Sequence, residues 1–239
     1  MILFGNKKLQ YYKNILIKAD LHLHDQIADR LLCLRPPTTK TIVLDLGAGE
    51  GALSQRLIDL GYEVLAVDIN QDDFRCPEAE FLQVNFNHER QVKALKERYK
   101  EKFDIVLGVE VIEHVENPWE YIRLLNSLLK SGGLILITTP NTASWYSRLI
   151  FLRSGRFHQF SDADLSYGHI APISPWELEN IMVSEGFCDI HLEPAGTLPD
   201  FWFLPSVKHI LMNIIGLLLR AFMKGPTRGW CIMATGVKK

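Results

Sequence analysis

The sequence predicts an α/β protein with a Rossmann-like, doubly wound and mostly parallel sheet. Short apolar runs alternate with segments whose apolar residues recur at helical spacing, which is typical of a parallel sheet covered on both faces. The first apolar run, residues 41–46, leads directly into glycines at positions 47, 49 and 51. The second run ends in an acidic residue, Asp68. Because such sheets bind ligands at the carboxyl ends of their strands, we expect a ligand at this glycine turn.

The order of elements follows from the same patterns. Residues 9–34 mix apolar and polar positions at helical spacing until Pro36 and Pro37, which predicts a helical cap over residues 1–39. Strands and helices then alternate through a core of residues 40–140. The expected strands are residues 42–46, 64–69, 80–84, 105–109, 134–138, 189–193 and 230–236, and the expected helices are residues 52–60, 90–100, 118–129 and 175–185.

The bulk properties limit the class of protein. A chain of 239 residues is long enough for one domain with a large core, and we expect a single domain over residues 1–239. A net charge of -2 gives no electrostatic support to binding of nucleic acid. The four cysteines lack the spacing of a zinc site or a disulfide framework, and residues 1–8 lack the features of a secretory signal. These observations favour the cytoplasm, and they leave the oligomeric state open.

The glycine turn and the acid after it predict a nucleoside ligand. Glycine lets the backbone turn sharply and approach a ligand without a Cβ atom in the way. Asp68, about 20 residues further on, is placed to accept hydrogen bonds from ribose hydroxyls. However, Gly47, Gly49 and Ala52 also satisfy the looser G-x-G-x-x-G/A pattern of dinucleotide enzymes, so this unit alone leaves the cofactor open.

A longer series of motifs resembles the class I S-adenosylmethionine-dependent methyltransferases. It consists of VLDLGAGEG at residues 43–51, Asp68, FDIVLGVEVIEH at residues 103–114 and GGLILITTPN at residues 132–141. The resemblance covers roughly residues 41–187. It implies S-adenosylmethionine as the cofactor and an antiparallel last strand. It also favours a methyltransferase over the alternative, a nicotinamide-dependent oxidoreductase.

The cofactor-binding residues follow from the resemblance and from the chemistry of the ligand. Asp45 can favour the cationic end of S-adenosylmethionine, which carries a sulfonium and an ammonium group. Asp68 is expected to bind the ribose. Asn85 stands where the family usually has an acid, and its carbonyl oxygen can accept from the adenine amine. The full expected set is Asp45, Gly47, Ala48, Gly49, Gly51, Asp68, Ile69, Asn85, Phe86 and Glu110.

An acidic and histidine-rich cluster follows the fourth strand. If the chain turns helical there, Glu110, Glu113 and His114 share one face, and with His169 they could hold a divalent metal ion that activates an acceptor hydroxyl. The motif resembles two metal-using branches of the family, the ubiquinone-pathway O-methyltransferases and the small-RNA 2′-O-methyltransferases. Without a metal, His114 or His169 is a general base, with Glu110 beside it. The cluster could equally orient the cofactor ammonium and cap the helix.

Two segments, residues 141–170 and 198–228, are additions to the minimal pattern. Both contain aromatic and basic residues, and the second includes FWFLP at residues 201–205 and an apolar run at residues 209–219. They are expected to be lids over the substrate side. A second hypothesis is contact with a membrane surface, since basic and aromatic residues beside an apolar helix suit the headgroup region. The apolar run falls short of the ~20 residues needed to cross a bilayer.

Together these observations predict an enzyme that methylates oxygen on a small or lipid-linked acceptor. A location in the cytoplasm, peripheral to the inner membrane face, suits a lipid-linked acceptor. The alternatives are a metal-dependent 2′-O-methyltransferase acting on RNA, the oxidoreductase above, and a cofactor-binding module without catalytic activity.

Overall fold

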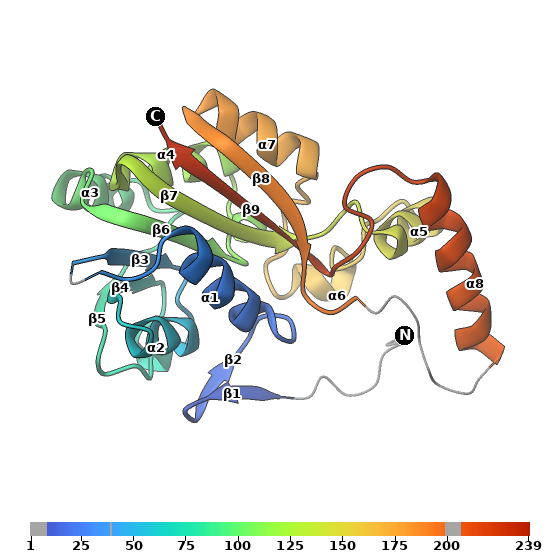
Figure 1. The fold of residues 1–239 in the computed structure, drawn as a ribbon, viewed down its shortest axis with the longest axis horizontal. Helices are drawn as coiled ribbons and strands as arrows, with labels where there is room; N and C mark the ends of the chain where they lie inside the picture. The colour runs from blue at the N-terminus through green and yellow to red at the C-terminus, as the bar shows by residue number, and fades with distance from the viewer. Residues whose placement is uncertain (1–8, 39, 199–206) are drawn as a thin grey trace.

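A seven-stranded sheet with helices on both faces forms the body of the protein (Figure 1). The computed structural model describes residues 9–38, 40–198 and 207–239. The strand order is β5-β4-β3-β6-β7-β9-β8, and only β9 runs antiparallel to its neighbours. The strands are β3 (Ile42–Leu46), β4 (Glu63–Asp68), β5 (Glu80–Gln83), β6 (Phe103–Val109), β7 (Leu129–Pro140), β8 (Phe187–Ala195) and β9 (Cys231–Lys238). The predicted fold class is therefore confirmed.

The sheet is buried on both faces because successive residues of its central strands point to opposite sides. Leu44 and Leu46 of β3 lie in the core under α3 (Glu89–Tyr99), α4 (Pro118–Leu128) and α7 (Pro175–Ser184). Val43 lies in the opposite core, under α1 (Leu23–Leu34) and α2 (Ala52–Asp59). This burial explains why these strands are apolar without alternation in the sequence.

The amino-terminal segment corrects the predicted helical cap. Within residues 9–38 only α1 is helical; before it, β1 (Gln10–Tyr12) and β2 (Ile15–Ile17) form an antiparallel hairpin. Lys13 and Asn14 form the turn with φ values of 45° and 68°, the positive values that two-residue hairpin turns favour. Ile15 and Ile17 are buried against the α2 side of the protein. The apolar spacing that resembled a helix thus belongs to a hairpin made of aromatic and β-branched residues.

The two additional segments come together beside the sheet. The first contains α5 (Trp145–Ser154) and α6 (Asp162–Leu165), and the second contains α8 (Val207–Phe222). Helices α5 and α8 pack against each other, with Gly216 so close to the Trp145 ring that an added Cβ would lie 3.1 Å from it. Figure 1 shows α8 at the far side of α5 from the sheet. The aromatic segment at residues 201–205 lies outside the described residues. So do residues 1–8, where the sequence predicts no secretory signal.

Among the residues that the structure describes, no helix combines the length and apolarity needed to cross a membrane.

The turn at Gly47 allows a test of close packing. Gly47 has a φ of 89°, and an added Cβ would lie 2.1 Å from Cγ2 of Val111. We expect Gly47→Ala to lower the free energy of unfolding by about 2–6 kcal/mol, since the strained φ and the overpacking each cost about 1–3 kcal/mol. Gly132→Ala is the matched control, because Gly132 has a φ of 72° with no atom within 4 Å of the added Cβ. Urea unfolding measures both, and equal losses would contradict the packing argument.

Candidate functional site

One cavity of about 620 Å³ lies at the carboxyl ends of β3, β4 and β6. The hairpin, the glycine turn and the loops after β5 and β6 contribute to its wall. Of the predicted site residues, those on the cavity wall are Asp45, Gly47, Ala48, Gly49, Asp68, Ile69, Asn85, Phe86, Glu110, Glu113, His114 and His169. Gly51 is absent from that wall; an added Cβ there would meet Phe74 at 2.7 Å and Cys76 at 2.8 Å. Its place in the turn is therefore explained by packing.

The glycine turn is attached to the neighbouring strand by its backbone. The amides of Gly47 and Ala48 both donate to the carbonyl oxygen of Val67, at 2.8 and 3.1 Å. Gly49 has a φ of 55°, and no atom lies within 4 Å of a Cβ built on it. The backbone at Gly49 therefore borders open space in the cavity, where a ligand can approach it directly.

Asp68 is held at the end of β4 by two backbone amides. The Gly49 amide donates to Oδ2 at 2.8 Å, and the Asn70 amide donates to Oδ1 at 3.2 Å. Each carboxylate oxygen retains a lone pair for another donor. The side chain is thus oriented before a ligand arrives, with both oxygens able to accept from adjacent hydroxyl groups.

Asp45 is a buried carboxyl group at the base of the cavity. Its side chain is 1% exposed and accepts a hydrogen bond from Oγ of Ser54 at 2.6 Å. Burial raises the pKa of Asp45 to about 6; the Ser54 hydrogen bond opposes this shift and the charge of Asp68 adds to it. A cation bound in the cavity would stabilise the ionised form of Asp45.

The residues expected around adenine lie on the same wall. Ile69 is 57% exposed, and Phe86 packs with Tyr121 at a ring-centroid distance of 5.9 Å. The Oδ1 atom of Asn85 already accepts from the amide of Asn87 at 2.9 Å. One lone pair of Oδ1 therefore remains for a donor from a ligand.

The structure corrects the expected arrangement of Glu110. The short 3₁₀ helix η2 covers Ile112–His114, so Glu110 precedes it and has a φ of 54°. The Glu110 carboxylate turns toward the sheet, where it accepts from Oγ1 of Thr138 at 2.9 Å and from Sγ of Cys231 at 3.5 Å. The single helical face that would have held Glu110, Glu113 and His114 together does not form. Glu110 lines the cavity beside the cluster and is no member of it.

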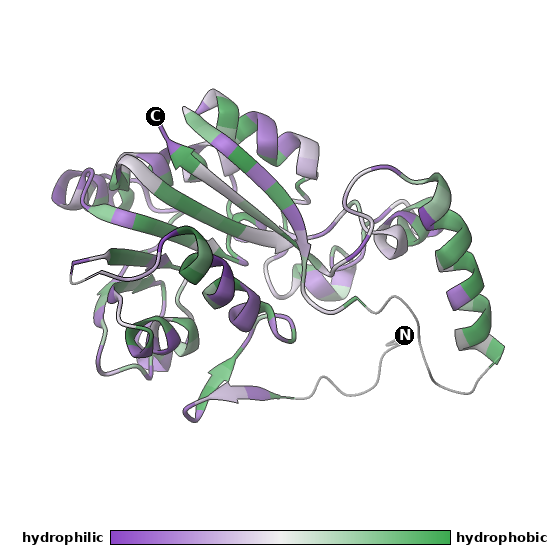
Figure 2. Cartoon of the chain, viewed as in Figure 1, coloured by the Kyte–Doolittle hydropathy of each residue, from purple (hydrophilic) through white to green (hydrophobic). Residues whose placement is uncertain are grey.

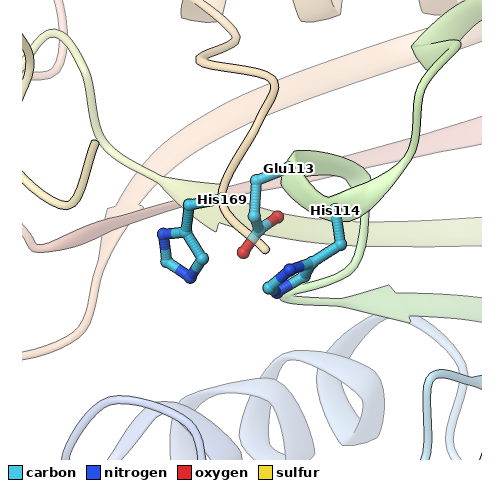
Figure 3. Close-up of side chains that lie close together, drawn as sticks. All are labelled: Glu113, His114 and His169. Carbon is cyan, nitrogen blue, oxygen red and sulfur yellow. The ribbon is translucent and has the colours of Figure 1, made fainter. Parts of the chain in front are cut away.

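Glu113, His114 and His169 form a compact cluster (Figure 3). One ligand atom from each lies within 4.8 Å of those of the other two, and the two imidazole rings flank the Glu113 carboxylate. Glu113 is fully buried; Oε2 accepts from Oγ1 of Thr139 at 3.1 Å, whereas Oε1 has no hydrogen-bond partner among the described residues. Burial, and then the charge of Glu110, raise the pKa of Glu113 well above its usual range.

Both histidines are positioned by the loop that carries His169. Nδ1 of His169 donates to the carbonyl oxygen of Gln159 at 2.8 Å, which leaves the lone pair on Nε2. Burial, followed by the neighbouring His169, lowers the pKa of His114, so His114 is a neutral imidazole at neutral pH. An added Cβ on Gly168 would lie 3.0 Å from Nδ1 of His114, so the close approach requires glycine there.

Several cavity residues were missed by the sequence analysis. Lys18, Asp20 and His24 reach the cavity from the amino-terminal segment, and Gln159 reaches it from the loop after α5. His24 is buried, and burial lowers its pKa to about 4. No local pattern marks these positions, because they reach the site only when the hairpin, α1 and the loop after α5 fold over the sheet.

Comparison with known proteins decides between the two cofactors that the glycine turn left open, S-adenosylmethionine and a nicotinamide dinucleotide. The sequence model of a family described as "Methyltransferase domain" matches residues 19–192 of the 239-residue chain. The chain belongs to the class I S-adenosylmethionine-dependent methyltransferases. Membership of this family resolves the choice that the glycine turn left open and argues against a nicotinamide-dependent oxidoreductase.

The chain is also similar to curated proteins in sequence and to a solved structure in fold. The chain is 37% identical over 117 residues to a ubiquinone biosynthesis O-methyltransferase of Ruegeria pomeroyi, covering 47% of this chain and 46% of that protein. The corresponding protein of Caulobacter vibrioides is 33% identical over 117 residues, with the same coverage. The chain therefore matches about half the length of these curated relatives. A methyltransferase structure from Archaeoglobus fulgidus shares the fold, with a TM-score of 0.62, 21% identity and coverage of 90% and 94% of the two chains.

Proposed function

We propose that this methyltransferase transfers the methyl group of S-adenosylmethionine to a hydroxyl oxygen of a small or lipid-linked acceptor. The observation that carries the proposal is that one cavity joins the glycine turn and Asp68 to the cluster of Glu113, His114 and His169. The first part suits the nucleoside, and the second suits an oxygen that must lose its proton. The O-methyltransferase relatives, which match half of the chain, support oxygen as the acceptor atom.

The reaction needs alignment and a proton acceptor. The sulfonium group already activates the methyl carbon, so the acceptor oxygen attacks that carbon, the carbon–sulfur bond breaks, and S-adenosylhomocysteine leaves. The acceptor proton must be removed as the oxygen attacks. His114 suits this role because its lowered pKa favours the neutral imidazole, whereas the raised pKa of Glu113 disfavours its charged form in the free enzyme.

The same cluster fits a divalent metal ion. Glu113 offers a buried oxygen that has no hydrogen-bond partner in the described part of the chain. Nδ1 of His169 donates to a carbonyl oxygen, the usual arrangement for a histidine that binds a metal through Nε2. Glu113, His114 and His169 would hold the ion, and Glu110 would not. A bound ion would lower the pKa of an acceptor hydroxyl. These three residues replace the four that the sequence predicted.

Methyl transfer from radiolabelled S-adenosylmethionine tests the proposed function. The acceptors are phenols, sugar alcohols, prenylated phenols and a short RNA with a free 3′ ribose, each assayed with added Mg²⁺ or Mn²⁺ and with a chelator. We expect label in one of the first three classes. Label in RNA alone would select the 2′-O-methyltransferase alternative. If calorimetry detected neither S-adenosylmethionine nor S-adenosylhomocysteine binding, the proposal would fail.

The pH dependence of cofactor binding tests the role of Asp45. Because the pKa of Asp45 is about 6 and a cationic ligand favours its ionised form, binding below that pH must release a proton. We expect the affinity for S-adenosylmethionine to fall as the pH decreases from 7 to 5, by up to about tenfold per pH unit below pH 6. Calorimetry at several pH values measures this slope. Asp45→Asn should flatten it, and an unchanged slope in that variant would exclude Asp45 as its source.

A further inference from the structure

Helix α8 presents a row of apolar side chains to solvent. Of its 16 residues, seven are large apolar residues that are exposed, with exposed fractions from 51% for Ile214 to 88% for Phe222. They recur at spacings of three and four along the helix, so they lie on one side of it. We call them the α8 stripe: Val207, Ile210, Leu211, Ile214, Leu217, Leu218 and Phe222. Figure 2 shows the helix coloured as hydrophobic over most of its length.

Packing within the protein accounts for the other side of α8 only. Met212 and Leu219 lie in a cluster with Trp145 and Tyr146 of α5, and Gly216 meets the Trp145 ring. This contact packs α8 against α5. The α8 stripe has no packing partner among the described residues. A contiguous row of exposed apolar side chains marks an interaction surface.

Helices α5 and α8 contain no acidic residue. Residues 201–239 contain no Asp or Glu, and neither do residues 121–161, which include α5. The exposed residues Arg153, at the end of α5, and Lys224, after α8, have no ion pair among the described residues. The guanidinium of Arg148 donates to the carbonyl oxygen of Lys224 at 2.7 Å, which joins the two basic segments. The whole chain, by contrast, has a net charge of -2.

We propose that the α8 stripe, with the basic ends of α5 and α8, docks the protein on the surface of an anionic lipid bilayer. An amphipathic helix with an aliphatic face and cationic borders lies in the plane of the headgroups, with its apolar residues in the acyl boundary and its cations near the phosphates. This inference goes beyond the proposed methyl transfer and does not depend on it, because the surface is separate from the cavity.

Charge favours a bilayer over a second copy of this chain. A symmetric dimer through the stripe would use the same surface on both copies, so neither copy would supply acidic residues to offset the basic ones. Anionic headgroups instead supply charge opposite to that of Arg153 and Lys224. The proposal therefore requires both parts of the surface, the α8 stripe and the basic residues beside it.

Co-sedimentation of the full chain with vesicles tests the proposal, with cofactor absent. We expect binding to vesicles of equal phosphatidylglycerol and phosphatidylcholine and much weaker binding to phosphatidylcholine alone. The triple variant Leu211→Ser, Leu217→Ser and Leu218→Ser should bind at least about tenfold more weakly, since each exposed leucine contributes to burial in the acyl region. The control is Tyr11→Ser, Leu32→Ser and Val183→Ser, which removes three exposed apolar residues elsewhere.

A second pair of variants tests the cations. Arg153→Gln with Lys224→Gln should weaken binding to the anionic vesicles by about 25-fold, because each basic residue near the surface contributes about fivefold. Lys40→Gln with Lys100→Gln changes the net charge equally at other exposed sites and should bind as the unmodified protein does. Unchanged S-adenosylhomocysteine affinity in every variant would show that the cavity is intact.

Two results would overturn the proposal. One is equal binding of the stripe variant and its control to anionic vesicles. The other is a dimer in sedimentation velocity that the stripe variant converts to a monomer while the unmodified protein ignores vesicles, which would assign the surface to a second copy of the chain.

Discussion

Replacing Asp68 by alanine is expected to weaken binding of S-adenosylmethionine by about 10²- to 10⁴-fold. Asp68 is oriented by the amides of Gly49 and Asn70 and keeps a lone pair on each oxygen. Two ribose hydroxyls would therefore lose a charged acceptor. Hydrogen bonds to charged groups contribute about 1.5–3 kcal/mol each, and about 1.4 kcal/mol corresponds to a factor of ten. Isothermal titration calorimetry with the unmodified protein and the variant measures the change.

Two further variants separate ligand binding from folding. Asp72→Ala removes an exposed carboxylate four residues away, and its affinity should stay within about threefold of the unmodified protein. Asp68→Asn keeps one acceptor oxygen, so its loss should be intermediate. If Asp68→Ala and Asp72→Ala bound the cofactor equally well, Asp68 would not be the ribose acceptor. Circular dichroism of each variant confirms that the fold is retained.

Replacing His114 by glutamine is expected to reduce kcat by about 10²- to 10⁴-fold, the usual contribution of a general base. The affinity for S-adenosylhomocysteine should change little, because that ligand has no acceptor oxygen to deprotonate. Steady-state assays with an acceptor from the screen above, together with calorimetry, give the two quantities. His88→Gln is the matched control, since His88 is an exposed histidine away from the cavity wall.

The geometry around His114 supplies an independent variant. Gly168→Ala would place a Cβ 3.0 Å from Nδ1 of His114, at a residue with a φ of 87°. The imidazole would be displaced without removal of its base, so Gly168→Ala should lower kcat while changing the pH profile less than His114→Gln does. A His114→Gln variant with unchanged kcat would remove His114 from the proton transfer and leave His169 as the base.

The position of the glycine turn and Asp68 beside the cavity was predictable because the sequence signals for it are local. Within about 30 residues the chain contains two apolar strands, the glycines at 47 and 49, and Asp68. The turn requires glycine because of its backbone conformation, and an acid at the end of the second strand is placed to bind a ribose. Gly51 shows the limit of this reasoning. It belongs to the same motif, yet the structure places it under Phe74 and Cys76 rather than on the cavity wall.

The acceptor side was predictable only in part. The sequence singled out Glu113, His114 and His169, and the structure brings these three together. It also suggested Glu110, whose side chain instead turns to Thr138 and Cys231 because the chain does not become helical until Ile112. The amino-terminal hairpin was wrongly expected to be helical, since apolar spacing over a few residues fits both structures until the turn at Lys13 and Asn14 is known.

By itself, the sequence determined the parallel sheet, the glycine turn and the acid at the end of the second strand, because side-chain periodicity and glycine backbone freedom act over short stretches of chain. Only the tertiary structure decided which residues complete the cavity. His169 reaches His114 across 55 positions of sequence, and His24 arrives from the amino-terminal segment. Those contacts come from the packing of α1, the hairpin and the loop after α5 over the sheet, and packing between distant segments leaves no periodic trace in the chain.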